Sequence, residues 1–211
     1  MSTVILQGPC GDFHIPSEPQ RTREVCEFLA RQVWAGEYAH PEIQPPEVML
    51  DIGAGWGAFA VWAFAWWPGL RALTCYEPHR EAYELLLANT EGAASRIEYV
   101  EAAITADPAA LYSCHEDWGA GRTHEQQSGV PVRIIHPRDL PECDMMKCDN
   151  EGSEIEVLTH YQHWPGVRSL LMEFHSPDNR VRLMQIASEL GLRLLKEPPD
   201  SASYGVTLWT R

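Results

Sequence analysis

The sequence predicts an α/β fold built around a parallel sheet, and two observations carry this prediction. Short apolar segments typical of strands alternate with longer segments of helical periodicity, which is the pattern of βαβ units. In the segment 48–57, VMLDIGAGWG, an apolar strand runs into an acidic residue and three closely spaced glycines. A strand, a glycine loop and a helix in this order form the nucleotide pocket of doubly wound sheets. With 211 residues, the chain has the size of one ordinary domain.

The N-terminal part is expected to lie outside the main pattern. The first 20 residues are interpreted as an irregular arm or an edge strand, because prolines and glycines interrupt their short apolar pieces. An amphipathic helix is expected over 21–34, followed by a turn-rich connector over 36–46. We therefore divide the chain into an arm and helix that pack on the core, residues 1–46, and a main domain, residues 47–211.

The remaining elements alternate along the chain. Strands are expected over the apolar segments 48–51, 72–76, 97–104, 132–135, 144–148, 169–174, 192–195 and 205–209. Helices are expected over 58–67, 78–90 and 178–190, and another begins near residue 152 or 153. The polar, aperiodic segment 115–129 is interpreted either as a lid over the acceptor or as a disordered loop. The tryptophan-rich segment 62–67 is assigned to the core or to a subunit interface, which leaves a homodimer open.

The overall composition argues against several classes of protein. The net charge is −14 and the only lysines are Lys147 and Lys196, whereas nucleic acids are bound through clusters of Lys and Arg. No stretch of about 18 apolar residues is present, so we expect no membrane span. The N-terminus lacks the features of a signal peptide, so a cytoplasmic location is expected. The cysteines form no CxxC pair, show no zinc-ligand spacing and are expected to be reduced.

The glycine loop fits the patterns of two cofactor sites. Gly53, Gly55 and Ala58 satisfy the G-x-G-x-x-A pattern of dinucleotide sites. Gly53, Gly55 and Gly57 satisfy the G-x-G-x-G pattern of methyltransferases. Asp51 favours the second pattern, because its carboxylate can face the cationic amino-acid part of S-adenosylmethionine and would repel a pyrophosphate.

Further polar residues fall at the ends of predicted strands. Glu77 ends the strand that follows the glycine loop, where a carboxylate can accept hydrogen bonds from both hydroxyls of a ribose. The segment 144–154, DMMKCDNEGSE, carries Lys147, Asp149 and Glu151 to the end of a buried strand, where ligands bind in open α/β sheets. Lys147 and Asp149 alternate with apolar residues, so they are expected to share a face and to pair with each other.

Taken together, these residues make the chain resemble the FkbM family of S-adenosylmethionine-dependent methyltransferases. The resemblance rests on DIGAGWG at 51–57, CYEPHREAYELLLAN at 75–89, EAAI at 101–104, the D-x-E-G-x-E signature at 149–154 and MEFH at 172–175. The signature at 149–154 is the most distinctive of these matches. Asn150 departs from the family, which usually has an apolar residue there, and its amide is interpreted as a cap of the following helix.

The resemblance implies a Rossmann-like class I methyltransferase fold, with a mostly parallel seven-stranded sheet, an antiparallel last strand and helices on both faces. It implies S-adenosyl-L-methionine as methyl donor and a small molecule or glycan as acceptor. The reaction expected from the family is O-methylation of a hydroxyl on a sugar or small natural product. Transferred residue by residue, the cofactor site comprises Asp51, Gly53, Ala54, Gly55, Gly57, Glu77, Ala102 and Ala103.

Methyl transfer to a hydroxyl is helped by a base that removes the proton. The candidates are Asp149, Glu151 and His175, with Lys147 beside them in the catalytic set. His175 has a suitable unperturbed pKa, although it is equally well placed to cap the following turn. Glu173 lies on an apolar strand and needs a partner, and Lys147 is the candidate for a structural ion pair with it.

Other mechanisms and functions stay open. Asp149, Asn150 and Glu173 or His175 come from adjacent strand ends and offer ligands for Mg²⁺, which would orient a vicinal diol, but no metal-ligand spacing supports this ion. The nearest alternative function is an N-methyltransferase acting on a peptide or amino sugar. Alternatives of a different class are an NAD-dependent oxidoreductase and a non-catalytic protein that only binds the cofactor.

Overall fold

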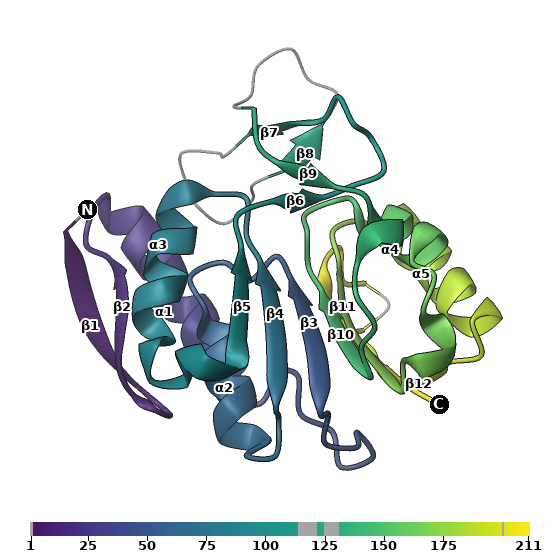
Figure 1. Cartoon of the computed structure of the whole chain (residues 1–211), viewed down its shortest axis with the longest axis horizontal. Coiled ribbons are helices and arrows are strands. Elements are labelled where there is room, and N and C mark those ends of the chain that lie inside the picture. The colour runs from purple at the N-terminus through teal and green to yellow at the C-terminus, as the bar shows by residue number, and fades with distance from the viewer. Residues whose placement is uncertain (1, 114–121, 125–130, 200) are drawn as a thin grey trace.

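A seven-stranded sheet forms the centre of the computed structural model, which describes residues 2–113, 122–124, 131–199 and 201–211. Its strands lie in the order β12 (Arg193–Lys196), β13 (Gly205–Thr210), β11 (Ser169–Phe174), β10 (Met145–Cys148), β3 (Val48–Ile52), β4 (Ala72–Tyr76) and β5 (Ile97–Val100) (Figure 1). The four pairs from β11 to β5 are parallel, whereas β13 runs antiparallel to both β11 and β12. The mostly parallel sheet with an antiparallel last strand is therefore confirmed.

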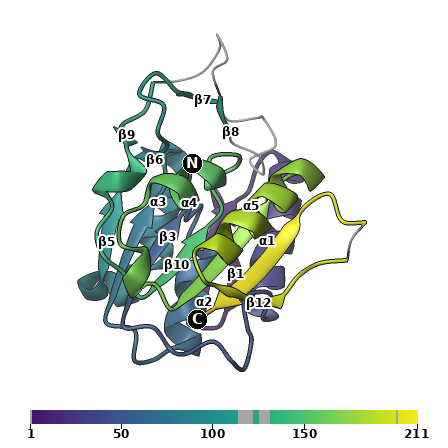
Figure 2. The ribbon, with the colours of Figure 1, turned by 90° about the vertical axis from the view of Figure 1, so that its right-hand side faces the viewer.

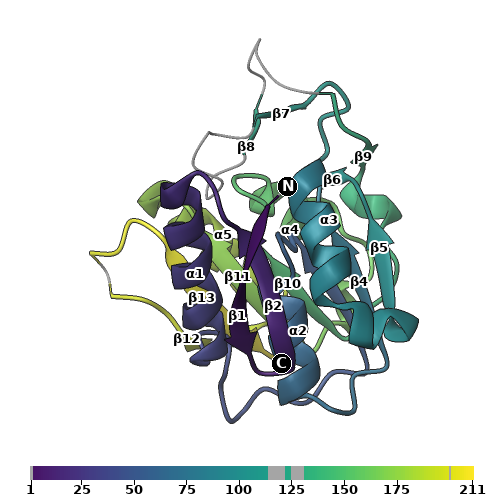
Figure 3. The ribbon, with the colours of Figure 1, turned by 90° about the vertical axis from the view of Figure 1, so that its left-hand side faces the viewer.

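Helices cover both faces of this sheet. On one face lie α1 (Gln20–Trp34), α2 (Ala58–Trp66) and α3 (Arg80–Asn89) (Figure 3). On the other lie α4 (Glu154–His160) and α5 (Pro177–Glu189) (Figure 2). Short 3₁₀ helices follow α3, precede β10 and precede β11: Glu91–Arg96, Pro137–Asp139 and Trp164–Gly166. Apart from the differences described below, the predicted helices and strands agree with these bounds to within about two residues.

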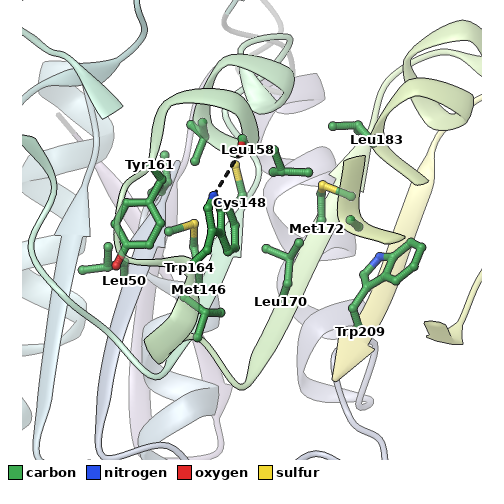
Figure 4. Close-up of a cluster of buried hydrophobic side chains, with 14 of the residues drawn as sticks. Leu50, Met146, Cys148, Leu158, Tyr161, Trp164, Leu170, Met172, Leu183 and Trp209 are labelled. Atoms are coloured by element: carbon green, nitrogen blue, oxygen red, sulfur yellow. Dashed lines mark hydrogen bonds between the residues drawn. The ribbon is translucent and has the colours of Figure 1, made fainter. Parts of the chain in front are cut away.

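Alternation along the strands divides the core into two layers, because successive side chains of a strand point to opposite faces. On the face of α4 and α5, the buried side chains are those of Leu50, Met146, Cys148, Leu170, Met172, Leu158, Tyr161, Trp164 and Leu183 (Figure 4). Trp164 satisfies its indole N–H there by donating to the carbonyl of Leu158 at 3.0 Å. The opposite layer is centred on α2, whose side chains are apolar all round, as expected of a helix covered on every side.

The tryptophan-rich end of α2 belongs mainly to this core. Trp62 and Trp67 are buried and pack edge to face, with ring centroids 5.1 Å apart. Trp66 is exposed and stacks on Trp62 at 5.6 Å. None of the helices in the described ranges is both long and apolar enough to cross a bilayer.

The N-terminal segment differs from the prediction of an irregular arm or edge strand. Strands β1 (Thr3–Gly8) and β2 (Gly11–Pro16) form an antiparallel hairpin that is separate from the central sheet (Figure 3). Phe13 and Ile15 alternate toward the interior and are fully buried, which anchors the hairpin. Asn89 of α3 completes it, donating to the carbonyl of His14 at 2.9 Å and accepting from its N–H at 2.6 Å.

The predicted strand 97–104 is in fact two strands. The pairing of β5 with β4 ends at Val100. Strand β6 (Ala103–Ile104) then leaves the sheet and pairs in parallel with β9 (Ile134–Ile135). Outside the sheet, β7 (Leu111–Ser113) pairs antiparallel with β8 (Arg122–His124). The predicted lid over 115–129 lies outside the described residues except for β8.

Candidate cofactor and active site

A cavity of about 1010 Å³ opens at the carboxyl ends of the central strands. Its walls come from the glycine loop after β3, the ends of β4, β10 and β11, helix α1, and the segment between β12 and β13. Its size suits a small-molecule ligand, and its place at the strand ends is where open α/β sheets bind ligands. The predicted cofactor residues that line it are Gly53, Ala54, Gly55, Glu77, Ala102 and Ala103.

The glycine loop is shaped by two different requirements. Gly53 has a φ of +78°, and a Cβ there would lie 1.7 Å from the carbonyl oxygen of Asp149, so only glycine lets the loop pass against the end of β10. Gly55 has a φ of +54°, but a Cβ would meet no atom within 4 Å. Gly55 therefore keeps space open in the cavity. Gly57 caps the start of α2 and does not line the cavity. A Cβ on Gly57 would lie 3.0 Å from Cδ1 of Leu86, so glycine leaves room for that side chain.

Glu77 holds the glycine loop in place. Its carboxyl oxygens accept hydrogen bonds from the backbone N–H groups of Gly55 at 2.8 Å and His79 at 2.7 Å. Burial raises the pKa of Glu77 to about 7, although these two hydrogen bonds favour its charged form. Each carboxylate oxygen keeps acceptor capacity for a further donor. The predicted contact with a ribose stays a prediction that this placement permits.

Asp51 is placed differently from the prediction. Its carboxylate is fully buried, does not line the cavity and lies 3.2 Å from the ammonium of Lys147 on the neighbouring strand. The cation that faces Asp51 in this structure is thus a lysine of the protein. Burial raises the pKa of Asp51, Lys147 partly offsets this, and the charge of Asp149 raises the pKa further.

Lys147 of β10 links the end of β10 to the end of β3. Its ammonium donates to the carbonyl of Gly53 at 2.5 Å and pairs with Asp51 and Asp149, which confirms the expected pairing with Asp149. Burial opposes the charge of Lys147, but these carboxylates outweigh it and raise its pKa. The expected structural ion pair with Glu173 is wrong, because the two closer carboxylates take up the ammonium. Glu173 instead lies beside Asp149, and burial together with that charge raises its pKa to about 9.

His175 is surrounded by carboxylates. Its Nε2 lies 3.1 Å from Glu154 and 3.5 Å from Asp149, and its Nδ1 lies 3.5 Å from Glu151. Burial alone would lower the pKa of His175, but the contacts with Asp149 and Glu154 raise it to about 11. His175 is therefore an imidazolium at neutral pH and has no free lone pair to accept a proton. This corrects the expectation of a base with an unperturbed pKa.

Asp149 is the ionised member of the group. Burial would raise its pKa, yet Lys147 and His175 hold the pKa of Asp149 well below its usual range. A carboxylate stabilised in this way is a weak base. Its charge instead orders its neighbours: the ammonium on one side, the imidazolium on the other and the protonated Glu173 beside it.

Asn150 ties β10 to β6. Its Nδ2 donates to the carbonyl of Ile104 at 3.0 Å, so its amide does not cap the following helix as expected. The expected metal set also changes: among the described His, Cys, Asp and Glu residues, the group whose ligand atoms lie within 4.8 Å of one another is Asp149, Glu151 and His175, without Glu173. A metal ion there would have to displace the proton that the carboxylates hold on His175.

Two features of the signature loop were not foreseen. Glu151 has a φ of +55°, which makes it the one non-glycine residue with positive φ in the described chain. Glu154 is fully buried, and both its oxygens accept from the N–H of Gly152, at 3.0 and 3.1 Å, while one oxygen contacts His175. Glu154 thus links the loop at Gly152 to His175. Its place in the D-x-E-G-x-E signature was the available signal.

Comparisons with known proteins place this geometry in a structural class. No protein-family model and no curated protein sequence matches the chain. Among solved structures, it is similar to the methyltransferase FkbM from Methylobacillus flagellatus, at 17% identity and a TM-score of 0.59, over 86% of this chain and 47% of that one. It is also similar to a precorrin-6y methyltransferase from Geobacter metallireducens, at 14% identity and a TM-score of 0.51, over 94% of both chains.

A third similar structure is a ribosomal protein methylase from Lactobacillus delbrueckii, at 11% identity and a TM-score of 0.50, over 92% of this chain and 80% of that one. Two of these proteins are named for different acceptors, a precorrin and a ribosomal protein, so the likeness selects no substrate. Membership of the FkbM family stays a prediction. What the likeness establishes, together with the strand order and the helices on both faces, is that this chain has the Rossmann-like fold of class I methyltransferases.

Proposed function

We propose that this protein is an S-adenosylmethionine-dependent methyltransferase that methylates a hydroxyl on a sugar or small natural product. The observation that carries the proposal is the glycine loop held by Glu77, with Gly55 opening onto a cavity at the carboxyl ends of the strands. The fold supports the same reaction class. The rest of the cavity wall supports the choice of cofactor.

The charges of the cavity favour a cationic ligand. Glu37, Glu77 and Glu173 line it, and burial raises the pKa of each, with Asp149 raising those of Glu37 and Glu173 further. Burial is the largest cause of each rise, so a cation placed beside these groups would offset it by favouring their charged forms. A sulfonium cofactor meets this condition. An NAD-dependent oxidoreductase would keep the glycine loop and Glu77, but it leaves the D-x-E-G-x-E residues unexplained.

Each part of the cofactor has a matching part of the wall. In the proposed arrangement the loop at Gly53, Ala54 and Gly55 holds the methionine end, Glu77 accepts from the ribose hydroxyls, and Ala102 and Ala103 lie beside the adenine. Asp51 acts indirectly, because it pairs with Lys147, whose ammonium donates a hydrogen bond to the carbonyl of Gly53. When bound, S-adenosylmethionine supplies an electrophilic methyl carbon, which bonds to the acceptor oxygen as the carbon–sulfur bond breaks and the acceptor loses its proton.

Glu151 is the proposed proton acceptor. It lines the cavity, whereas His175 is already protonated and Asp149 is a weak base. Its left-handed backbone costs about 1–2 kcal/mol for a residue with a Cβ, and such strain is concentrated at functional sites. His175 lies 3.5 Å away and serves as a positioning residue that orients the carboxylate. The same wall would serve an N-methyltransferase acting on a peptide or amino sugar, which is the second candidate.

A thermal-shift experiment tests the cofactor assignment. We expect S-adenosylhomocysteine, but not NAD, to raise the melting temperature of the wild-type protein. Gly55→Val should remove this effect, because the new side chain enters the open space of the cavity. Gly11→Val is the matched control: Gly11 also has a positive φ and open space around it, but it begins β2 and does not line the cavity. Equal stabilisation by NAD, or none by S-adenosylhomocysteine, overturns the proposal.

A further inference from the structure

The cavity has a second half that the proposed cofactor does not use. The cofactor residues lie after β3, after β4 and at β6, and the charged residues of the wall lie at the ends of β10 and β11. Much of the remaining wall comes from α1 and from the segment between β12 and β13. On α1 this wall carries Val25, Phe28 and Leu29. An acceptor that reaches the methyl group from the open side has to lie against these two elements.

Exposed aromatic residues gather in this half. Large apolar side chains that stay exposed in the described chain are Ile5, Phe28, Trp66, Leu87, Val181 and Tyr204. Of these six, only Phe28 and Tyr204 line the cavity, and both keep about two thirds of their surface exposed, at 64% and 68%. They come from different walls, Phe28 from α1 and Tyr204 from the segment before β13. Exposed apolar side chains concentrated in a cavity indicate a binding site.

Two of the polar side chains beside them are engaged within the protein. Gln32 of α1 donates its amide to the carboxyl of Glu37 at 2.9 Å. Lys196, at the end of β12, donates to the backbone carbonyl of Glu37 at 2.6 Å. Ser201 and Ser203 also line this half. A flat aromatic ring needs apolar faces, which Phe28 and Tyr204 offer, and a polar group on that ring can use the serine hydroxyls. The described wall of this half therefore suits an aromatic ring that carries a polar group.

Helix α5 contacts the segment between β12 and β13 that carries Tyr204. Arg180 of α5 donates to the carbonyls of Pro198 and Pro199, both at 3.1 Å, and to the carboxylate of Glu197 at 2.9 Å. At the other end of the segment, a Cβ on Gly205 would lie 2.5 Å from the ring of Pro198, so the chain folds back on itself there. Arg180 therefore holds the Glu197–Pro199 end of the segment, and the Gly205 end, next to Tyr204, lies close to Pro198.

We propose that this half of the cavity is an acceptor site for a flat aromatic small molecule that bears a hydroxyl, bound against Phe28 and Tyr204. The proposal rests on the proposed methyltransferase function and narrows its acceptor from sugars and natural products in general to phenols. The hydroxyl would reach toward the carboxyl groups at the middle of the cavity, and the ring would lie between α1 and the segment before β13.

Calorimetric titration with naphthol tests the site in the full-length protein saturated with S-adenosylhomocysteine. We expect naphthol to bind, and Phe28→Ala and Tyr204→Ala each to weaken its affinity about tenfold, as loss of an aromatic contact does. Tyr204→Phe should keep wild-type affinity, because the ring is what matters. Trp66→Ala is the matched control, since Trp66 is a similarly exposed aromatic residue outside the cavity, and it should change the affinity less than about twofold.

The outcomes separate this inference from the proposed function. If methyl glucoside binds and naphthol does not, the acceptor is a glycan and the inference is wrong while the cofactor assignment stands. If neither binds, or if Phe28→Ala and Tyr204→Ala leave naphthol affinity unchanged, the aromatic site is wrong as well. Failure of S-adenosylhomocysteine itself to bind would overturn the proposed function. All three alanine variants change exposed side chains, so their melting temperatures should confirm folding.

Discussion

Removing the ammonium of Lys147 should strongly lower the free energy of unfolding, because it pairs with buried carboxylates. Its ammonium lies 3.2 Å from the fully buried carboxylate of Asp51 and 3.3 Å from Asp149, and it donates to the carbonyl of Gly53. In Lys147→Met the hydrophobic stem is kept and the charge is lost. Asp149 retains His175 as a cation, but Asp51 is left buried without a partner.

The size of the effect follows from this geometry. Charges 3.2 Å apart attract by about 5 kcal/mol at an effective dielectric constant of about 20, and breaking a buried pair on one side costs about 3–5 kcal/mol. For a chain of this length that corresponds to a fall in melting temperature of about 6–20 °C. The double variant Lys147→Met/Asp51→Asn removes the orphaned charge as well, so it should recover at least about half of the loss.

Thermal and urea unfolding followed by circular dichroism measure both variants. Arg193→Met is the control, because Arg193 and Glu42 form an ion pair of similar length, 2.7 Å, between half-exposed side chains. Its loss should leave the free energy of unfolding almost unchanged, because solvent screens an exposed pair. If Lys147→Met costs no more than Arg193→Met, or if adding Asp51→Asn gives no recovery, the buried charge network is not what holds the two strand ends together.

Other predictions concern the same loops. Gly53→Ala should lower the free energy of unfolding by more than about 3 kcal/mol, and Gly55→Ala by only about 1 kcal/mol. Both glycines have a positive φ, but only a Cβ at Gly53 meets the carbonyl of Asp149. Equal urea midpoints for the two variants would contradict this. Folded Glu77 holds its proton more tightly than the unfolded chain does, so its stabilising contribution is full below pH 4.5 and is lost as the pH rises to about 7. Relative to Glu77→Gln, the wild type should therefore lose about 3 kcal/mol over this range in urea titrations, and a constant difference refutes the assignment. Glu151→Gln should lower turnover of a labelled methyl donor by about 100-fold or more with unchanged affinity for S-adenosylhomocysteine, and full turnover would exclude it as the base. Treatment with EDTA should leave turnover unchanged, and a loss restored by Mg²⁺ would establish a metal mechanism.

The regular elements could be predicted from local pattern, and the exceptions have physical reasons. The apolar strands from β3 to β13 and the helices between them were found because each buries a continuous run or one stripe of side chains. The hairpin at residues 3–16 was missed because its inward side chains are few, Phe13 and Ile15 with the partly buried Val4 and Leu6, and lie amid prolines and glycines. The break after Val100 was missed because β6 leaves the sheet for a partner, β9, about thirty residues away.

The site was predicted in its location but not in its protonation. The glycines, Glu77 and the signature residues all fall at the strand ends that a parallel sheet brings together. The sequence does not show that His175 would have Asp149, Glu151 and Glu154 within 3.5 Å, and this clustering turns an expected base into a cation. Likewise, the register that places Lys147 opposite Asp51 decides which carboxylate receives the lysine. Charge states depend on such three-dimensional neighbours, which residue order alone does not give.

The most direct test of the central claim is an experimental structure of the protein with S-adenosylhomocysteine. We predict that the ribose hydroxyls lie within hydrogen-bonding distance of the Glu77 carboxylate. The adenine should lie beside Ala102 and Ala103, and the sulfur should face the half of the cavity lined by Phe28 and Tyr204. A ligand bound elsewhere, or a ribose without contact to Glu77, would contradict the account.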